Sequence, residues 1–425
     1  MEAHDLVLIT IGVVAFSLFS RRAEKGILTS PMAFMLFGLL ISPTVLDLME
    51  IQFHSALIND LAEITLALAL FTDASRINIQ ELDTQHDLPL RLLGIGLPLT
   101  IAAGMGVALL LFPGVTVWEA GIIGVILAPT DAALGQSVVN NPRVPVRIRQ
   151  ALNVESGLND GLAFPALLVF LSLASTSVEG RDFTGWLVFI GKQLVIGPLA
   201  GAFVGYTGAV LADHARKREW MSHIFLQIYV LALALLAYGF AELIGGNGFI
   251  AAFAAGLTVG AKSSILCQPL EDFGETEGQL LSLIVFLLFG STMVPRGLES
   301  IGWRDVAYAV LSLTAVRMGP VALCLWGKGL KSSTVAFLGW FGPRGLASIL
   351  YLLLIFERGG VSASNEIFST VVCTVLFSIL AHGMTASPGA LLYANHMEKL
   401  KEKKMPEHKD VHEFPTRLPH VRRVG

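Results

Sequence analysis

Residues 128–131 read Ala-Pro-Thr-Asp and lie inside a long apolar run, and residues 342–345, inside a second apolar run, read Gly-Pro-Arg-Gly. A proline inside a helix removes one amide donor and clashes with the preceding turn. Both runs are therefore predicted to be helices that break near their middles. The charged residues beside the two prolines, Asp131 and Arg344, would then lie deep inside the folded chain.

The composition indicates a polytopic membrane protein. Apolar residues make up 54 % of the 425 residues and charged residues only 15 %, against about 25 % charged in soluble domains. A soluble chain of this size would have too little polar surface to cover itself. Bilayer-crossing helices need about 20 apolar residues. Thirteen runs fit this requirement approximately, at 6–20, 27–46, 56–74, 89–112, 117–138, 148–176, 184–212, 222–244, 246–261, 277–294, 304–327, 332–356 and 364–392.

The basic residues predict how these spans are oriented, because cytoplasmic loops carry an excess of Lys and Arg. With the N-terminus outside, fourteen basic residues fall in cytoplasmic loops and eight in the C-terminal tail, against four in external loops. An even number of spans would place the basic tail outside. We therefore expect thirteen spans in the cell membrane with a cytoplasmic C-terminus, a transmembrane domain at 1–392 and a short cytoplasmic tail at 393–425.

The two predicted breaks fall in spans five and twelve, which are seven spans apart. An odd offset reverses the direction of a helix in the membrane, so the two halves would be inverted copies. The expected fold class is an all-α membrane protein of thirteen transmembrane helices, with spans 1–6 repeated as spans 8–13 and with the broken spans five and twelve crossing. Interrupted spans at matching positions are typical of transporters, where they mark the binding site.

Three glycines at four-residue spacing, Gly197, Gly201 and Gly205, lie in span seven. This spacing leaves one face of a helix without side chains, and a second helix can pack closely along it. We interpret the three glycines as a helix-packing surface and not as a phosphate-binding loop.

Span six carries the densest set of polar residues, Glu-Ser-Gly-Leu-Asn-Asp-Gly at 155–161. At about 100° per residue, its polar side chains lie on one helix face, namely those of Glu155, Ser156, Asn159 and Asp160. An ionisable group at the bilayer centre costs about 2.5–3.5 kcal/mol, so each such group is a functional candidate. This face is therefore predicted to contact water or a charged group.

Three carboxylates and two arginines are predicted to share the membrane core: Glu155, Asp160 and Asp131 against Arg317 and Arg344. An arginine does not lose its proton in proteins, so both arginines are interpreted as structural counter-charges. They neutralise two carboxylates and leave one that holds either a proton or a cation. Competition between these two ions for one site, combined with alternating access, would produce exchange.

Oxygen ligands for a hard monovalent cation are expected where span six meets the break in span five. The predicted cation ligands are Asp131, Ser156 and Asp160. Thr130 completes the ion- and proton-binding set, and Asp160 is predicted to carry the proton. Asp73, near the end of span three, is interpreted as a residue solvated at a span end.

The chain resembles the NhaP-type sodium/proton antiporters, relatives of the eukaryotic sodium/hydrogen exchangers, over nearly all thirteen spans. The matching motifs are residues 155–161, the pair Thr130-Asp131 and residues 342–345. The resemblance implies a homodimer with a dimer domain and a moving core domain.

The same resemblance implies roles for single residues. Asp160 would bind the ion and the proton, and Asp131, Ser156 and the carbonyl group of Thr130 would complete the cation site. Supporting roles fall to the residues around this set: Asn159 as the structural neighbour of Asp160, Glu155 paired with Arg317, and Arg344 in the second break.

The sequence therefore predicts an antiporter that exchanges Na⁺ for H⁺ in pH homeostasis, with K⁺ and Li⁺ as alternative cations. One surplus carboxylate predicts electroneutral exchange of one cation per proton. Besides the transported ions and membrane lipid, no cofactor is expected, and a net charge of −4 does not suggest a nucleic-acid partner. An enzyme is not expected, since no catalytic motif lies in a predicted span. Two alternatives remain, a sodium-coupled organic-anion symporter on a similar fold and a cation channel.

Overall fold

The computed structural model of this protein describes residues 3–23, 28–49, 56–77, 87–131, 133–175, 183–263, 266, 270, 272, 276–358, 361, 364–400, 405–409 and 411. All regular structure among these residues is helical. The helices of the first part are α1 (Ala3–Ala23), α2 (Ser30–Ile41), α3 (Ala56–Ser75), α5 (Asp87–Arg91), a π-helical turn (Leu92–Gly96), α6 (Leu97–Leu111), α7 (Val117–Ile126), α8 (Gln136–Val139) and α9 (Val146–Ala174). Those of the second part are α10 (Phe183–Lys217), α11 (His223–Leu243), α12 (Gly248–Lys262), α14 (Glu277–Leu288), a π-helical turn (Phe289–Met293), α15 (Val294–Ser300), α16 (Trp303–Leu313), α17 (Ala315–Cys324), α18 (Ser332–Trp340), α19 (Leu346–Arg358), α20 (Ser364–Leu400) and a 3₁₀ turn (Pro406–His408).

Apolar helices dominate the described part of the chain. Eight of them are long enough to cross a membrane: His4–Ala23, Asp87–Leu111, Val146–Ala174, Val188–Lys217, Ile224–Leu243, Glu277–Ser300, Trp303–Cys324 and Asn365–Leu400. Shorter apolar helices lie at Ser30–Ile41, Val117–Ile126, Gly248–Lys262 and Leu346–Phe356. The predicted class of an all-α membrane protein is confirmed, whereas the count of thirteen crossings and the inverted relation of the two halves stay predictions. The last long helix continues to Leu400, past the domain boundary predicted at residue 392.

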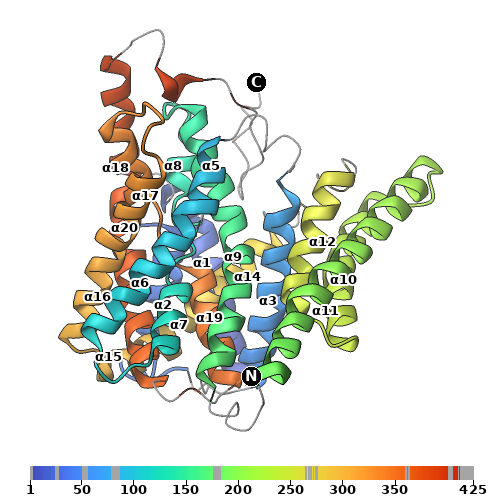
Figure 1. Cartoon of the computed structure of the whole chain (residues 1–425), viewed down its shortest axis with the longest axis horizontal. Coiled ribbons are helices and arrows are strands. Elements are labelled where there is room, and N and C mark those ends of the chain that lie inside the picture. The colour runs from blue at the N-terminus through green and yellow to red at the C-terminus, as the bar shows by residue number, and fades with distance from the viewer. Residues whose placement is uncertain are drawn as a thin grey trace.

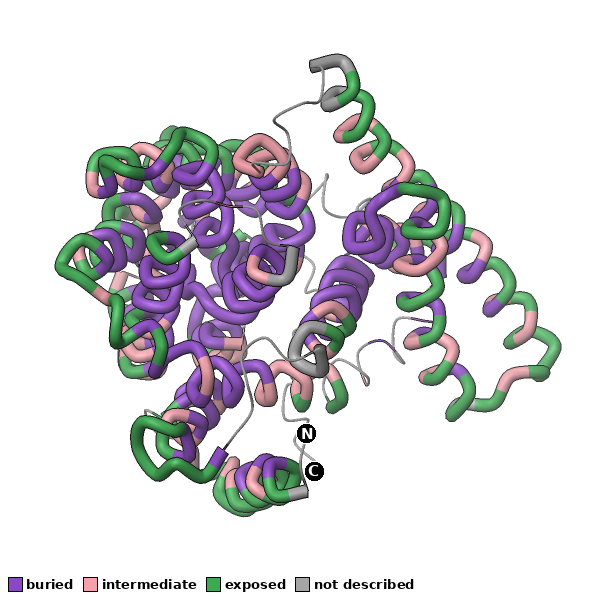
Figure 2. Tube along the Cα trace, turned by 90° about the horizontal axis from the view of Figure 1, so that it is seen from below, coloured by how far each residue is buried: buried purple, intermediate pink, exposed green. Residues whose placement is uncertain are grey.

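The helices form a bundle with two flanks. Figure 1 shows α10, α11 and α12 together on one side of the molecule and α16, α17, α18 and α20 on the other, with α9, α19 and α3 between them. Figure 2 shows that the buried residues lie on the inward faces of the helices and the exposed ones on the outward faces. On α10 and α11 the exposed side chains include Leu199, Phe203, Phe225 and Leu236. Such outward apolar side chains suit helices that are surrounded by lipid.

The predicted glycine ridge of span seven packs α10 against α12. A Cβ atom at Gly201 would lie 2.7 Å from the Cα atom of Ala251, and one at Gly205 would lie 2.6 Å from the carbonyl oxygen of Ala255. Real Cβ atoms do not approach a backbone this closely, so larger residues would push the two helices apart. The interpretation of these glycines as a helix-packing surface is confirmed.

We expect Gly201→Ala to destabilise the protein, because its new methyl group would collide with the backbone of α12. Overpacking of this kind costs about 1–3 kcal/mol, so the unfolding temperature in detergent, followed by tryptophan fluorescence, should fall. The matched control is Gly239→Ala on α11, where a Cβ atom meets nothing within 4 Å. The control should leave that temperature unchanged or slightly higher, since alanine is the better helix former. Equal unfolding temperatures for both variants would contradict the close approach of α10 and α12.

Candidate functional site

Both predicted helix breaks are present, and they contact each other. Between α7 and α8 the chain leaves the helix around Asp131, and between α18 and α19 it does so at residues 341–345. The backbone N–H group of Asp131 donates to the carbonyl oxygen of Pro343 at 2.8 Å. The predicted crossing of spans five and twelve is therefore a direct backbone contact.

The side chain of Asp131 adds two further hydrogen bonds. Its Oδ2 atom accepts from the backbone N–H group of Leu346, the first residue of α19, at 2.8 Å, and its Oδ1 atom accepts from that of Ala133 at 2.8 Å. Gly345 allows this approach, because a Cβ atom there would lie 3.0 Å from Cγ of Asp131. A helix N-terminus carries partial positive charge, so α19 stabilises the negative carboxylate that caps it.

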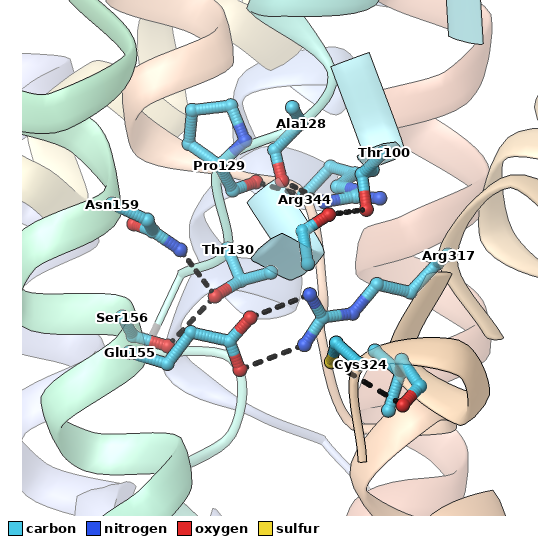
Figure 3. A network of polar contacts seen from close by, with 12 residues as sticks. Thr100, Ala128, Pro129, Thr130, Glu155, Ser156, Asn159, Arg317, Cys324 and Arg344 are labelled. Atoms are coloured by element: carbon cyan, nitrogen blue, oxygen red, sulfur yellow. Dashed lines mark hydrogen bonds and ion pairs between the residues drawn. The ribbon is translucent and has the colours of Figure 1, made fainter. Parts of the chain in front are cut away.

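The polar face of α9 packs against the first break. The hydroxyl groups of Thr130 and Ser156 lie 2.9 Å apart, and Nδ2 of Asn159 donates to the Thr130 hydroxyl at 2.7 Å (Figure 3). All three side chains are buried. Of the predicted ion- and proton-binding set, Thr130 and Ser156 are thus in direct contact, and Asp131 and Asp160 are the next residues along the chain from Thr130 and Asn159.

Asp160 lies on the same part of α9, with 7 % of its surface exposed. Its backbone carbonyl group accepts a hydrogen bond of 2.5 Å from the Tyr351 hydroxyl of α19. Tyr351 is fully buried, and its ring packs against Phe164 at a centroid distance of 5.5 Å. No sequence pattern marks Tyr351, because a tyrosine in an apolar run looks like any other core aromatic residue until its neighbours are known.

The predicted ion pair between Glu155 and Arg317 is present. The guanidinium group of Arg317, on α17, donates to both carboxylate oxygens of Glu155 at 2.5 and 2.8 Å (Figure 3). Each residue has only 2 % of its surface exposed. This two-pronged geometry joins α9 to α17 and neutralises both charges inside the bundle.

Arg344, predicted to be a structural counter-charge, bonds to backbone carbonyl groups. Its Nη1 atom donates to the carbonyl oxygens of Ala128 and Pro129, the latter at 3.2 Å (Figure 3). These carbonyl groups follow the C-terminal end of α7, where a helix carries partial negative charge. Among the described residues, Arg344 thus bonds to the carbonyl groups of the first break and not to a carboxylate.

A cavity opens beside the crossing. Its wall includes Ala133 and Leu346, whose backbone N–H groups hold the Asp131 carboxylate. Asp73 and Arg76 of α3 also line this cavity. Asp73 was expected to be solvated at a span end, but it is only 6 % exposed and faces the space that leads to the crossing.

The chain matches the family model of the transmembrane sodium/hydrogen exchangers over residues 6–391. It therefore belongs to the sodium/hydrogen exchanger family. This membership agrees with the resemblance found in the motifs of spans five, six and twelve.

Among curated relatives, the K⁺/H⁺ antiporter NhaP of Alkalimonas amylolytica is 27 % identical over 92 % of this chain and 67 % of its own length. The Na⁺/H⁺ antiporter of Saccharomyces cerevisiae is 28 % identical over 58 % of this chain but only 26 % of its own length. The chain thus spans between about a quarter and two thirds of these relatives. This chain is similar to the solved structure of the sodium proton antiporter MjNhaP1 from Methanocaldococcus jannaschii at pH 8, with a TM-score of 0.76 and 19 % sequence identity. The match covers 94 % of this chain and 99 % of the MjNhaP1 chain.

We expect Glu155→Ala and Arg317→Ala each to lower the unfolding temperature in detergent, because each leaves one buried charge without its partner. The loss of one partner of a buried ion pair costs about 3–5 kcal/mol. The double variant should recover part of this loss, since neither charge then remains.

The control for this pair is Arg143→Ala, which breaks the ion pair between Arg143 and Glu398 at 3.1 Å, with side chains 43 % and 52 % exposed. Such exposed pairs contribute about 0–1 kcal/mol, so this control should change the unfolding temperature little. Purely additive losses in the Glu155/Arg317 double variant would show that the two residues do not stabilise each other.

Proposed function

We propose that this protein is a secondary-active antiporter that exchanges a monovalent cation, Na⁺ or K⁺, for H⁺ across the membrane. The observation that carries the proposal is the crossing of two broken helices at Asp131, packed against the polar face of α9 and open to a cavity. Carboxylate, hydroxyl and carbonyl oxygens together suit a small hard cation. Curated relatives named as Na⁺/H⁺ and K⁺/H⁺ antiporters support the same function, and these relatives do not support the organic-anion symporter or the channel.

In this proposal, Asp160 binds the cation and the proton alternately. Asp131, Ser156 and the carbonyl oxygen of Thr130 complete the cation site, with Li⁺ as a further candidate ion. The hydroxyl group of Thr130 bonds to Ser156 and Asn159, and the family resemblance assigns the Thr130 carbonyl group to the cation. A carboxylate that accepts either ion, but not both at once, couples the two fluxes.

The cavity supplies the path from one side of the membrane to the crossing. With the N-terminus outside, the end of α3 that bears Asp73 and Arg76 faces the cytoplasm. The cavity that these two residues line would then open toward the cytoplasm. We place the protein in the cell membrane with a cytoplasmic C-terminus, a transmembrane antiporter domain at 1–392 and a short tail after it. A homodimer is proposed on the family resemblance, and no cofactor is required by this mechanism.

Asp160→Asn keeps the size of the side chain but removes its charge and its proton. In proteoliposomes that enclose a pH-sensitive dye, we expect this variant to abolish proton flux driven by pulses of Na⁺, K⁺ or Li⁺, with choline as the inert cation. Its elution in gel filtration should match that of the wild-type protein.

The matched control is Asp47→Asn, at an exposed position whose φ of 51° asparagine also adopts. This control should exchange at the wild-type rate. Exchange at that rate by Asp160→Asn would exclude Asp160 as the carrier, and an equal response to choline would exclude cation-coupled transport.

Exchange should be electroneutral, because only one group in the proposed site releases a proton. Arg317 and Arg344 stay charged, Glu155 is held by Arg317, and both oxygens of Asp131 accept backbone N–H groups. In liposomes with a membrane potential set by a thiocyanate gradient, the Na⁺ gradient at which proton flux reverses should not move with voltage. A reversal point that shifts with voltage would mean that a second proton is carried and would overturn the one-site mechanism.

A further inference from the structure

Two polar residues of α20, Ser378 and His382, lie behind the break between α18 and α19 and take no part in the exchange described above. Both are buried, with exposed fractions of 0 % and 1 %. Neither was a sequence-based candidate, because one serine and one histidine in an apolar run carry no recognisable motif. Their hydrogen bonds nevertheless converge on the backbone that holds Asp131.

The peptide group between Pro343 and Arg344 is held at both of its ends. Its carbonyl oxygen accepts from the backbone N–H group of Asp131 at 2.8 Å, and its N–H group donates to Oγ of Ser378 at 2.6 Å. A peptide group is planar and stiff. A rotation that released the N–H group from Ser378 would therefore also turn the carbonyl oxygen away from Asp131.

His382 holds the other end of the same break. Its Nε2 atom lies 2.9 Å from the carbonyl oxygen of Trp340, the last residue of α18. Its Nδ1 atom lies 3.0 Å from the carbonyl oxygen of Ser378 and 3.2 Å from Oγ of the same residue. A carbonyl group only accepts, so Nε2 carries the proton. Oγ of Ser378 accepts from Arg344 and can therefore donate its own proton to Nδ1. In this tautomer the ring bonds to Trp340 and to the Ser378 hydroxyl group, whereas the contact between Nδ1 and the Ser378 carbonyl oxygen is not a hydrogen bond.

This arrangement is a clamp across residues 341–345. Helix ends leave backbone groups without helical partners, and such groups need other partners when they are buried. At this break, the carbonyl group of Trp340 accepts from the backbone N–H group of Gly342 and from His382, and Ser378 accepts from the N–H group of Arg344. The two clamp residues belong to one helix, so α20 sets the distance and the orientation between the two ends of the break.

We propose that Ser378 and His382 are positioning residues for the cation site: they hold the Pro343–Arg344 peptide group in the orientation that places Asp131. The inference rests on the proposed antiport function. Neither residue belongs to the proposed cation site. Loss of the clamp should therefore weaken cation binding more than it slows the transport cycle.

The test is the Na⁺ dependence of proton flux in proteoliposomes. His382→Leu removes both ring bonds at similar volume, and we expect it to raise the KM for Na⁺ about tenfold, as loss of one buried hydrogen-bond partner typically does, with kcat changed less than about twofold. His382→Gln places an amide N–H group near the position of Nε2 and should return the KM to near the wild-type value. Ser378→Ala should raise the KM as His382→Leu does, whereas Ser378→Thr keeps the hydroxyl group and should not.

The matched control is Thr385→Val, on the same face of α20. Thr385 accepts a hydrogen bond of 3.0 Å from the indole group of Trp340 and makes no bond to the backbone of the break. This control should keep the wild-type KM. An unchanged KM in both His382→Leu and Ser378→Ala, or an equal rise in Thr385→Val, would overturn the clamp. If His382→Leu does not fold, the KM values of Ser378→Ala and Ser378→Thr test the clamp on their own.

A second measurement separates the clamp from the proposed function. The purified variants are titrated with Na⁺ in detergent, and the rise in unfolding temperature reports cation binding without transport. His382→Leu and Ser378→Ala should need about tenfold more Na⁺ than the wild-type protein for the same rise. A wild-type protein that binds Na⁺ but does not exchange it would overturn the antiport function alone, whereas equal Na⁺ titrations for all variants would overturn the clamp alone.

Discussion

The contacts of Asp131 with the second broken helix are the interactions on which the rest of the site depends. Its backbone N–H group bonds to Pro343, and its carboxylate bonds to the backbone of Leu346 and of Ala133. A broken helix in a membrane leaves polar backbone groups that have no water to bond with. Here each break supplies the partners that the other lacks. The same bonds that make the two breaks tolerable therefore also place a carboxylate at the centre of the bundle.

The charges around the crossing are balanced by two different means. Glu155 and Arg317 form a two-pronged pair that joins α9 to α17. Arg344 instead faces carbonyl oxygens that follow α7, and the N-terminus of α19 faces Asp131. At the edge of the site, the charged side chains of Glu155 and Arg317 balance each other. At its centre, the charges of Arg344 and Asp131 are balanced by the partial charges of helix ends. In the proposed mechanism, Asp160 is the carboxylate whose charge changes with the bound ion.

Much of this architecture could be predicted because it depends on local chemistry. The membrane class follows from composition, since a chain with so few charged residues cannot cover itself in water. The breaks follow from Pro129 and Pro343, because a proline disrupts its own turn whatever surrounds it. The polar face of α9 follows from helical periodicity, and the pair of Glu155 with Arg317 agrees with the family motif.

Other features depend on which residues meet across the fold. Asp73 is buried in a cavity wall and not solvated at a span end, because α3 packs inside the bundle. Tyr351 and His382 bond to backbone carbonyl groups of other helices, and no local pattern marks them. The sequence by itself determined the membrane class, the two breaks and the polar face of α9, since each arises within a few neighbouring residues. Only the tertiary structure decided the partners of Asp131, Arg344 and His382, because a buried polar group bonds to whatever backbone the packing of distant helices brings within reach.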